Sequence, residues 1–249
     1  MNDKTVALAL LLAVFVSALS AVAQPDGPLA DARQLLLVVT GNWNAVDGTL
    51  LRFDRPDASA AWQAVGPPIP VVVGRTGLAW GRGLHPSQDG GPVKREGDGK
   101  APAGIFRLGK AFGQVDEAPA LWHMPYLFLA GDVECVDDVG SVHYNVLVTK
   151  QSVGTPDWKS SEKMWTEPLY KWGVVVEHNQ QPVQASGGSC IFLHIWRGPG
   201  RGTAGCTAME EPALTAAIAW LDPARTPLLV QRPREAYARL RSAWGLPGI

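Results

Sequence analysis

The chain has 249 residues, of which 46% are hydrophobic, and its 22 Lys and Arg residues nearly balance its 23 Asp and Glu residues, for a formal net charge of −1. Because binding to phosphates needs clustered positive charge and the chain has no run of Lys or Arg, this composition excludes a typical nucleic-acid-binding protein. The length suits one large domain, and no linker-like stretch divides it.

The N-terminal segment predicts export. Residues 6–19 form an almost unbroken apolar run, and the sequence Ala-Val-Ala at residues 21–23 has the small-x-small pattern of a signal-peptidase site. We therefore expect a signal peptide at residues 1–23 and a single domain at residues 24–249. The alternative is an uncleaved membrane anchor, but the apolar run is short for a span of roughly 20 residues. No later stretch is long and apolar enough to cross a bilayer.

Most of the chain predicts short strands. Segments rich in β-branched and aromatic residues alternate with turns of Gly, Pro, Asn and Asp. In chain order, the expected strands are residues 34–40, 49–53, 61–65, 69–73, 104–108, 126–129, 145–149, 173–177, 189–196 and 228–231.

Two segments near the C-terminus predict helices. Two Glu residues and a Pro at residues 210–212 favour a helix start, and the Asp-Pro pair at residues 222–223 ends that helix. Residues 235–244 place three large apolar or aromatic side chains on one helical face. The fold class is therefore mainly β with peripheral helices.

The segment "SCIFLHIWRGPGRGTAGC", residues 189–206, carries the candidate chemistry. If residues 189–196 form a strand, alternate side chains share a face, so His194 lies on the same face as Cys190, Phe192 and Trp196. The glycine-rich turn that follows then returns the chain and brings Cys206 beside the strand end that carries His194.

A thiol beside an imidazole indicates a nucleophile beside its base. A free thiol, with a pKa of about 8.5, is only slightly ionised at neutral pH, so a Cys206 nucleophile needs a neighbour such as His194. Gly205 leaves room for a substrate carbonyl oxygen to meet backbone N–H groups, as an oxyanion hole requires. The alternative is structural: a buried hydrogen-bonded histidine and a cysteine acting as a small hydrophobic residue.

These residues resemble those of a known family. Thr203-Ala204-Gly205-Cys206, downstream of the apolar strand with His194, resembles the Ser/Thr-x-Gly-Cys signature of the L,D-transpeptidase (YkuD-like) family. "DGKAPAGIF" at residues 98–106 is similar to that family's "TPxGxF" segment. Three further segments, "ECVDD" with the later "YN", "GVVVEHN" and "GSCIFLHIW", are similar to a secreted bacterial branch, and the resemblance spans about residues 34–247.

The resemblance implies a fold, a reaction and roles by position. The fold is a mixed β-sandwich of the L,D-transpeptidase catalytic-domain type. Cys206 falls on the nucleophile and His194 on the general base, Thr203 falls on the residue that supports the cysteine loop, and Gly205 falls where oxyanion donors converge. Family members cleave the bond between the third and fourth residues of the peptidoglycan stem peptide, expel D-Ala and form a thioester.

The same resemblance sets expectations for partners and location. An amine of a second stem peptide resolves the thioester in transpeptidation, and water resolves it in L,D-carboxypeptidation. We expect donor and acceptor stem peptides as partners, no cofactor or metal, a monomer, and a location in the periplasm of a bacterium. A third possibility is a catalytically silent wall-binding module whose 10 Trp residues stack on glycan, although most of them suit core packing.

The chain departs from the family pattern near the nucleophile. Ala204 stands where many members carry a second histidine, and Thr207-Ala208 follows the cysteine where many have a hydrophobic residue and Arg. The interval from His194 to Cys206 is also shorter than in many relatives. These departures bear on how the donor carboxylate is recognised and on the choice of acceptor.

Three cysteines in an exported chain leave one thiol if two of them pair. We expect a disulfide between Cys135 and Cys190, which would leave Cys206 reduced; two unpaired buried thiols are the alternative, and spacing does not decide between them.

Five further residues are candidates for substrate binding, each with a structural alternative. Trp196 shares the face of His194, His178 ends another expected strand, and Asn179 follows it. Tyr144 and Asn145 are candidates for holding the amino or carboxyl groups of a stem peptide, although turn chemistry is common for such residues at strand ends. The remaining histidines have no spacing that suggests zinc.

Overall fold

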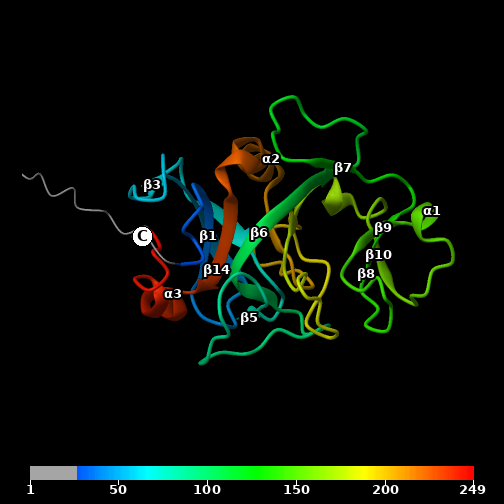
Figure 1. The fold of residues 1–249 in the computed structure, drawn as a ribbon, viewed down its shortest axis with the longest axis horizontal. Coiled ribbons are helices and arrows are strands. Elements are labelled where there is room, and N and C mark those ends of the chain that lie inside the picture. Colours follow the sequence, from blue (N-terminus) through cyan, green and yellow to red (C-terminus); the bar gives the residue numbers. More distant parts are fainter. Residues whose placement is uncertain (1–26) are drawn as a thin grey trace, which may run out of the picture.

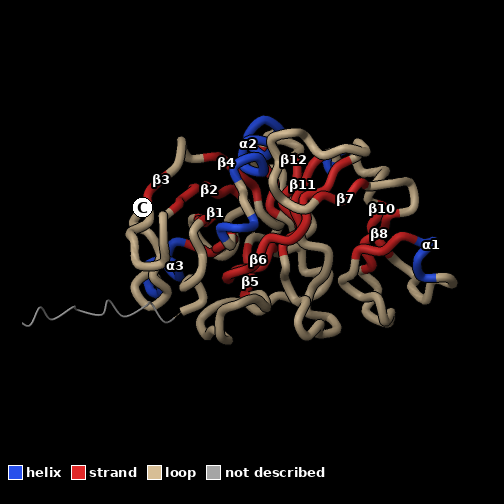
Figure 2. The backbone as a smooth tube through the Cα atoms, turned by 45° about the horizontal axis from the view of Figure 1, so that its top comes forward, coloured by secondary structure: helices blue, strands red, loops and turns tan. Residues whose placement is uncertain are grey.

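The computed structural model describes residues 27–249, so the predicted signal peptide at residues 1–23 lies outside the described residues. Strands make up 33% of the chain and helices 12%, which confirms the prediction of a mainly β fold. Figures 1 and 2 show a large body of strands with a small sheet beside it. Within the described residues, no helix is both long and apolar enough to span a membrane.

The large body is a closed barrel of eight strands. Around the barrel the strands are β1 (Gln34–Thr40), β14 (Pro227–Pro233), β6 (Ala101–Gly113), β11 (Trp172–Val176), β12 (Phe192–Ile195), β13 (Thr207–Met209), β4 (Ile69–Val72) and β2 (Asp47–Asp54). The barrel closes because β1 pairs with β14 on one side and with β2 on the other. The β1–β14 and β12–β13 pairs are parallel and the others are antiparallel. The sandwich form expected from the family resemblance is not confirmed.

Shorter elements cover the outside of the barrel. Strand β3 (Gln63–Ala64) pairs antiparallel with the end of β2, and β5 (Leu78–Trp80) and β7 (Tyr126–Phe128) pair with β6. Helix α2 (Glu211–Trp220) contacts β11 and β12, whereas α3 (Arg234–Leu240) contacts β14 and β1. A short 3-10 helix, η2 (Pro223–Arg225), follows α2, where the Asp-Pro pair ends the helix as expected.

The main hydrophobic core lies in the barrel and under these coverings. Strand β1 is buried along its whole length, because one of its faces points into the barrel and helix α3 packs nearby. Leu35 and Leu37 are fully buried, and so are their neighbours on the opposite face. Each buried side chain of this size contributes about 1.5–3 kcal/mol to folding, so the barrel provides a rigid support for the segments that leave it.

The small sheet consists of β8 (Val133–Val136), β9 (Leu147–Thr149) and β10 (Ser161–Lys163), with β8 in the middle. Helix α1 (Lys150–Val153) follows β9, and the 3-10 helix η1 (Pro168–Tyr170) follows β10. Glu134 is fully buried in this sheet. Burial alone would raise the pKa of its carboxyl, but hydrogen bonds from Lys150 and Lys163 lower it to about 2. The negative charge of Glu134 is therefore compensated by two lysines of the same part of the structure.

A second hydrophobic cluster and a disulfide join the small sheet to the barrel. The cluster includes Cys135 and Met164 from the small-sheet side and Phe112 and Phe192 from the barrel. Cys135 of β8 is bonded to Cys190, which precedes β12, and this is the disulfide expected from the sequence. The segment that leads into β12 is thus held covalently.

Several expected elements have different bounds in the structure. The expected strand at residues 189–196 is reduced to β12, because Cys190 has a φ of 54°, which extended backbone does not allow. The strand expected at residues 61–65 is reduced to β3, and the last helix ends at Leu240 instead of residue 244. Strands β5, β8, β10 and β13 were not predicted, since three or four residues hold too little of an alternating pattern.

Candidate active site

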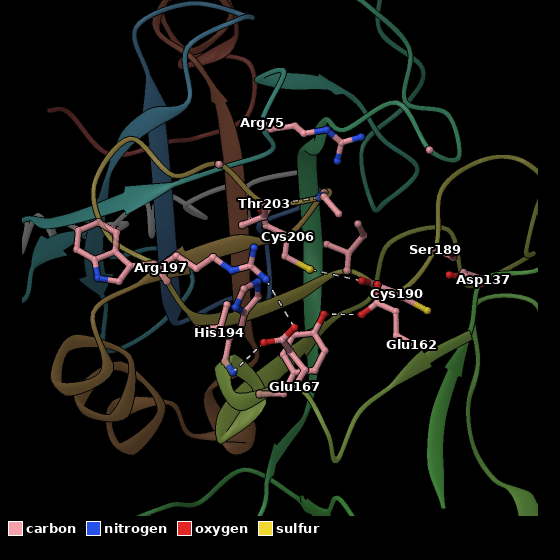
Figure 3. Close-up of a pocket in the computed structure, with 18 of the residues that line it drawn as sticks. Arg75, Asp137, Glu162, Glu167, Ser189, Cys190, His194, Arg197, Thr203 and Cys206 are labelled. Atoms are coloured by element: carbon pink, nitrogen blue, oxygen red, sulfur yellow. Dashed lines mark hydrogen bonds and ion pairs between the residues drawn. The ribbon is translucent and has the colours of Figure 1, made fainter. Parts of the chain in front are cut away.

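A cavity of about 760 Å³ lies between the barrel and the small sheet (Figure 3). Its walls come from segments far apart in the chain: the loop at residues 201–206 before β13, the end of β12, the loop around residue 95, the small sheet and η1. Cys206 and His194 both line it, as do Thr203, Gly205 and Trp196. We call it the Cys206 cavity.

The strand register places Cys206 and His194 on one face. In the parallel β12–β13 pair, His194 lies opposite Ala208, and Cys206 comes two residues before Ala208, so its side chain points to the same side. The backbone N–H of Phe192 donates a hydrogen bond to Cys206 Sγ, with the two atoms 3.3 Å apart. Cys206 therefore lies beside Phe192, one alternation along the strand from His194.

His194 has the tautomer that a general base needs. Its Nδ1 lies 2.7 Å from the carbonyl oxygen of Ile195, and a carbonyl oxygen can only accept, so Nδ1 carries the ring proton. Nε2 is then left as the acceptor. The side chain is 5% exposed, and burial lowers its pKa to about 4, so the imidazole is neutral at pH 7.

Cys206 is a protonated thiol in the same environment. Burial raises the pKa of its thiol far above the ordinary value, and the Glu162 carboxylate adds to this effect. The Phe192 N–H favours the thiolate but does not offset burial. The thiol in turn donates to the carbonyl oxygen of Cys190, 3.5 Å away. Cys206 and His194 are therefore both neutral at pH 7.

Thr203 holds the loop that carries the thiol. Its hydroxyl donates to the carbonyl oxygen of Cys206 at 2.6 Å and accepts from the N–H of Gly205 at 3.1 Å. Its backbone is tied to the neighbouring segment, because its N–H donates to Val73 and its carbonyl accepts from Arg75. The hydroxyl thus closes a small hydrogen-bonded ring in the loop that carries Cys206.

Gly205 contributes space. A Cβ added to it would lie 3.3 Å from both Ile191 Cδ1 and the carbonyl oxygen of Lys100, a distance at which those neighbours would have to give way. Its N–H is occupied by Thr203, so oxyanion donors would have to come from other N–H groups that face the cavity.

Charges of both signs line the Cys206 cavity. The cationic side chains are Arg75, Lys94, Lys163, Arg197 and Arg201, and the acidic ones are Glu96, Asp137, Glu162 and Glu167. Figure 3 shows Arg75 and Glu162 on different sides of the Cys206 sulfur. This distribution suits a ligand that carries both a carboxylate and an ammonium group, as a peptide does.

Four of the five expected substrate-binding residues do not line this cavity. His178 is 1% exposed, and both of its ring nitrogens are used, Nδ1 accepting from the N–H of Arg82 and Nε2 donating to the carbonyl oxygen of Gly187. Asn179 is equally buried and holds the following turn through Gln184. His178 and Asn179 were expected at a binding surface because they end a strand. In the structure, that end of the strand turns into the interior.

Tyr144 and Asn145 have supporting roles. Asn145 donates to the carbonyl oxygens of His178 and Asn179 and accepts from the N–H of Cys190, which helps to hold that residue in its left-handed conformation. The Tyr144 hydroxyl donates to Glu96, which does line the cavity. Trp196 alone among the five lines the cavity itself.

Other residues that line the cavity were not predicted from the sequence. Tyr170, Glu162, Glu167 and Arg75 come from segments with no motif of their own, and only the tertiary structure brings them to the thiol. No group of three or more His, Cys, Asp or Glu side chains within residues 27–249 is arranged to hold a metal ion.

The fold and site together define a closed mixed β-barrel with a buried Cys–His pair at one cavity. Comparisons of the chain with family models, curated proteins and solved structures found no match.

Proposed function

We propose that this protein is an exported cysteine acyltransferase of the L,D-transpeptidase type that acts on peptidoglycan stem peptides in the bacterial periplasm. The observation that carries the proposal is the placement of Cys206 and His194 on one face of the β12–β13 pair, inside a cavity with charges of both signs. The resemblance of the residues around Cys206 to the family motif supports peptidoglycan stem peptides as the substrate. We also propose that the domain is of the sandwich-type L,D-transpeptidase class.

The first half of the reaction forms a thioester. As Cys206 Sγ attacks the carbonyl carbon of the third stem residue, the thiol proton moves to Nε2 of His194. The Ile195 carbonyl, which accepts from Nδ1, stabilises the resulting imidazolium. The tetrahedral intermediate then collapses, the bond to the fourth residue breaks, and the departing amine takes the proton from Nε2.

The second half releases the acyl group. An amine of a second stem peptide attacks the thioester and loses a proton to Nε2, and the sulfur leaves as a thiol after taking that proton back. Water in place of the amine gives L,D-carboxypeptidation by the same steps. The acidic side chains of the cavity, Glu162 and Glu167 among them, favour the approach of a cationic acceptor and support transpeptidation as the leading reaction.

Mass spectrometry of a purified disaccharide-tetrapeptide incubated with the protein tests the proposal. We expect loss of one alanine with the wild type and none with Cys206→Ala. Crosslinked dimers would identify a transpeptidase and free tripeptide a carboxypeptidase. If neither sample changes while the protein still pulls down with intact sacculi, the wall-binding module is the better account.

A further inference from the structure

Tyr170 connects the catalytic pair to an acid on the small sheet. It ends η1, is 7% exposed, and its ring meets the ring of His194 edge to face, with centroids 5.2 Å apart. Phe112 and Phe192 meet the same ring edge to face at 5.9 Å and 5.5 Å. Its hydroxyl donates a hydrogen bond to Glu162 Oε2. Ring contacts therefore hold the aromatic part of Tyr170, and a hydrogen bond holds its hydroxyl.

Glu162 has a fixed place in the Cys206 cavity. It lies on β10 opposite Cys135, which is bonded to Cys190, and the Cys190 carbonyl accepts from the Cys206 thiol. Glu162 lines the cavity, and Figure 3 shows it on the side toward which the Cys206 sulfur points. The backbone of Glu162 is therefore held to the segment whose carbonyl contacts the Cys206 thiol, and its carboxylate lines the same cavity as that thiol.

Glu162 differs from the other acid of the small sheet in its partners. Glu134 forms ion pairs with Lys150 and Lys163, whereas Glu162 takes part in none of the ion pairs found within residues 27–249. The charged groups that act on it are Asp137, Glu96 and Glu167, all negative, and its hydrogen bond comes from a neutral phenol. No ion pair within residues 27–249 therefore compensates its negative charge, although Lys94 and Lys163 line the same cavity.

We propose that Glu162 and Tyr170 are positioning residues that set the reactivity of Cys206: the Tyr170 ring orients His194, and the Glu162 carboxylate that its hydroxyl holds opposes ionisation of the thiol. The physical reason is that a second negative charge in the same partly buried cavity is unfavourable. The thiol therefore stays protonated until attack on a carbonyl sends its proton to His194. This inference rests on the proposed function for its purpose but not for its test.

The charged groups around the thiol determine how the reactivity of Cys206 depends on pH. Glu162 and Tyr170 face it from the small-sheet side, His194 from β12, and Lys94 from a loop as the opposing cation. Burial raises the pKa of Glu162 to about 7 and that of Tyr170 well beyond neutral, and His194 titrates near 4. Of Glu162, Tyr170 and His194, Glu162 is therefore the group whose charge changes between pH 5 and pH 9.

The test is the rate of alkylation of Cys206 by iodoacetamide, followed by mass spectrometry between pH 5 and pH 9. The disulfide protects the other two cysteines. In the wild type we expect the logarithm of the rate to rise with pH and to flatten near pH 7, where Glu162 ionises. Glu162→Gln keeps an acceptor for Tyr170 but removes the charge. It should lack the flattened region and react about tenfold faster above pH 8, which corresponds to about one pKa unit of the thiol.

Two further variants separate charge from structure. Glu211→Gln removes a carboxylate from a surface ion pair with Lys171, outside the cavity, and should leave the profile unchanged. Tyr170→Phe keeps the ring but deletes the hydroxyl, so the ionised Glu162 loses a donor and the flattened region should move to higher pH.

Identical profiles for the wild type and a folded Glu162→Gln would overturn the inference, and so would an unmoved profile in Tyr170→Phe if Glu162→Gln does not fold. Because iodoacetamide needs no peptidoglycan, these outcomes are separate from the tetrapeptide assay. If the alkylation profile changes in Glu162→Gln but the wild type releases no alanine from the tetrapeptide, the inference stands and the proposed substrate is rejected.

Discussion

The rings of Tyr170 and His194 meet edge to face at an interplanar angle of 84°, although the two residues come from different parts of the fold. Tyr170 ends a 3-10 helix that follows the small sheet, and His194 lies on a barrel strand. The contact therefore makes the orientation of the imidazole depend on how the small sheet is attached. The disulfide between Cys135 and Cys190 is the covalent part of that attachment.

Removing this disulfide should lower the stability of the protein and open the Cys206 cavity. Cys135 and Cys190 are 55 residues apart, and a loop of that size implies a loss of about 4 kcal/mol in the free energy of unfolding on the chain-entropy view. Chemical denaturation of the double variant Cys135→Ser/Cys190→Ser checks the loss. Its iodoacetamide reaction at Cys206 should also accelerate, because the cavity opens; an unchanged rate would mean that the small sheet stays in place without the bond.

Thr203→Val should impair the loop that carries the nucleophile. The substitution keeps the shape of the side chain but deletes the hydroxyl that bonds both the Cys206 carbonyl and the Gly205 N–H. We expect a loss of about 1–2 kcal/mol in stability and a fall of tenfold or more in turnover of the tetrapeptide. Thr203→Ser retains the hydroxyl and is the matched control, so equal activity of the two variants would contradict this role.

Gly205→Ala should destabilise the protein through a close contact. The added Cβ would lie 3.3 Å from Ile191 Cδ1, and we expect a cost of about 1–3 kcal/mol measured by thermal or chemical unfolding. Ile191→Val removes that methyl group, so the double variant should recover part of the loss. Strict additivity of the two substitutions would show that the clash lies elsewhere.

Acid should destabilise the protein before any carboxyl group of ordinary pKa titrates. His85, His178 and His194 are buried, and burial lowers the pKa of each to about 4 in the folded state, from 6.5. A depressed histidine pKa means that the unfolded chain binds more protons between these values, so stability is present above pH 6.5 and is lost as pH falls toward 4.

The size of this loss is about 2 kcal/mol for each histidine between pH 7 and pH 5. Glu162 offsets about 2 kcal/mol of the total, because burial raises its pKa to about 7 and its carboxyl therefore takes up a proton in the folded state over the same range. Urea unfolding at the two pH values measures it. His178→Asn should remove about 2 kcal/mol of this pH dependence, whatever its effect on absolute stability. A free energy of unfolding that is flat over this range would show that the three imidazoles are more hydrated than their burial indicates.

The local pattern was sufficient to predict part of the site. The alternation of side chains in a strand puts Phe192 and His194 on one face, and a turn rich in glycine returns the chain toward Cys206; both follow from residues close together in the sequence. The pairing of Cys135 with Cys190 was also favoured from the sequence, because export permits a disulfide and this pairing leaves Cys206 reduced, although the spacing did not decide it.

Other parts of the site depend on contacts between distant segments. His178 and Asn179 were expected at the binding surface because they end a strand, yet that end turns inward and their polar atoms satisfy the backbone around Gly187 and Gln184. No local signal distinguishes a strand end that faces solvent from one that is covered by a later loop.

The sequence by itself determined the candidate nucleophile, its base and a mainly β chain, because these depend on residue type and on periodicities of two to four residues. Only the tertiary structure decided that the main sheet closes into a barrel, that Glu162 and Tyr170 stand beside the thiol, and that Cys206 and His194 are both neutral at pH 7. Protonation states follow from burial and from charges brought together across the fold, and neither is encoded in the spacing of residues along the chain.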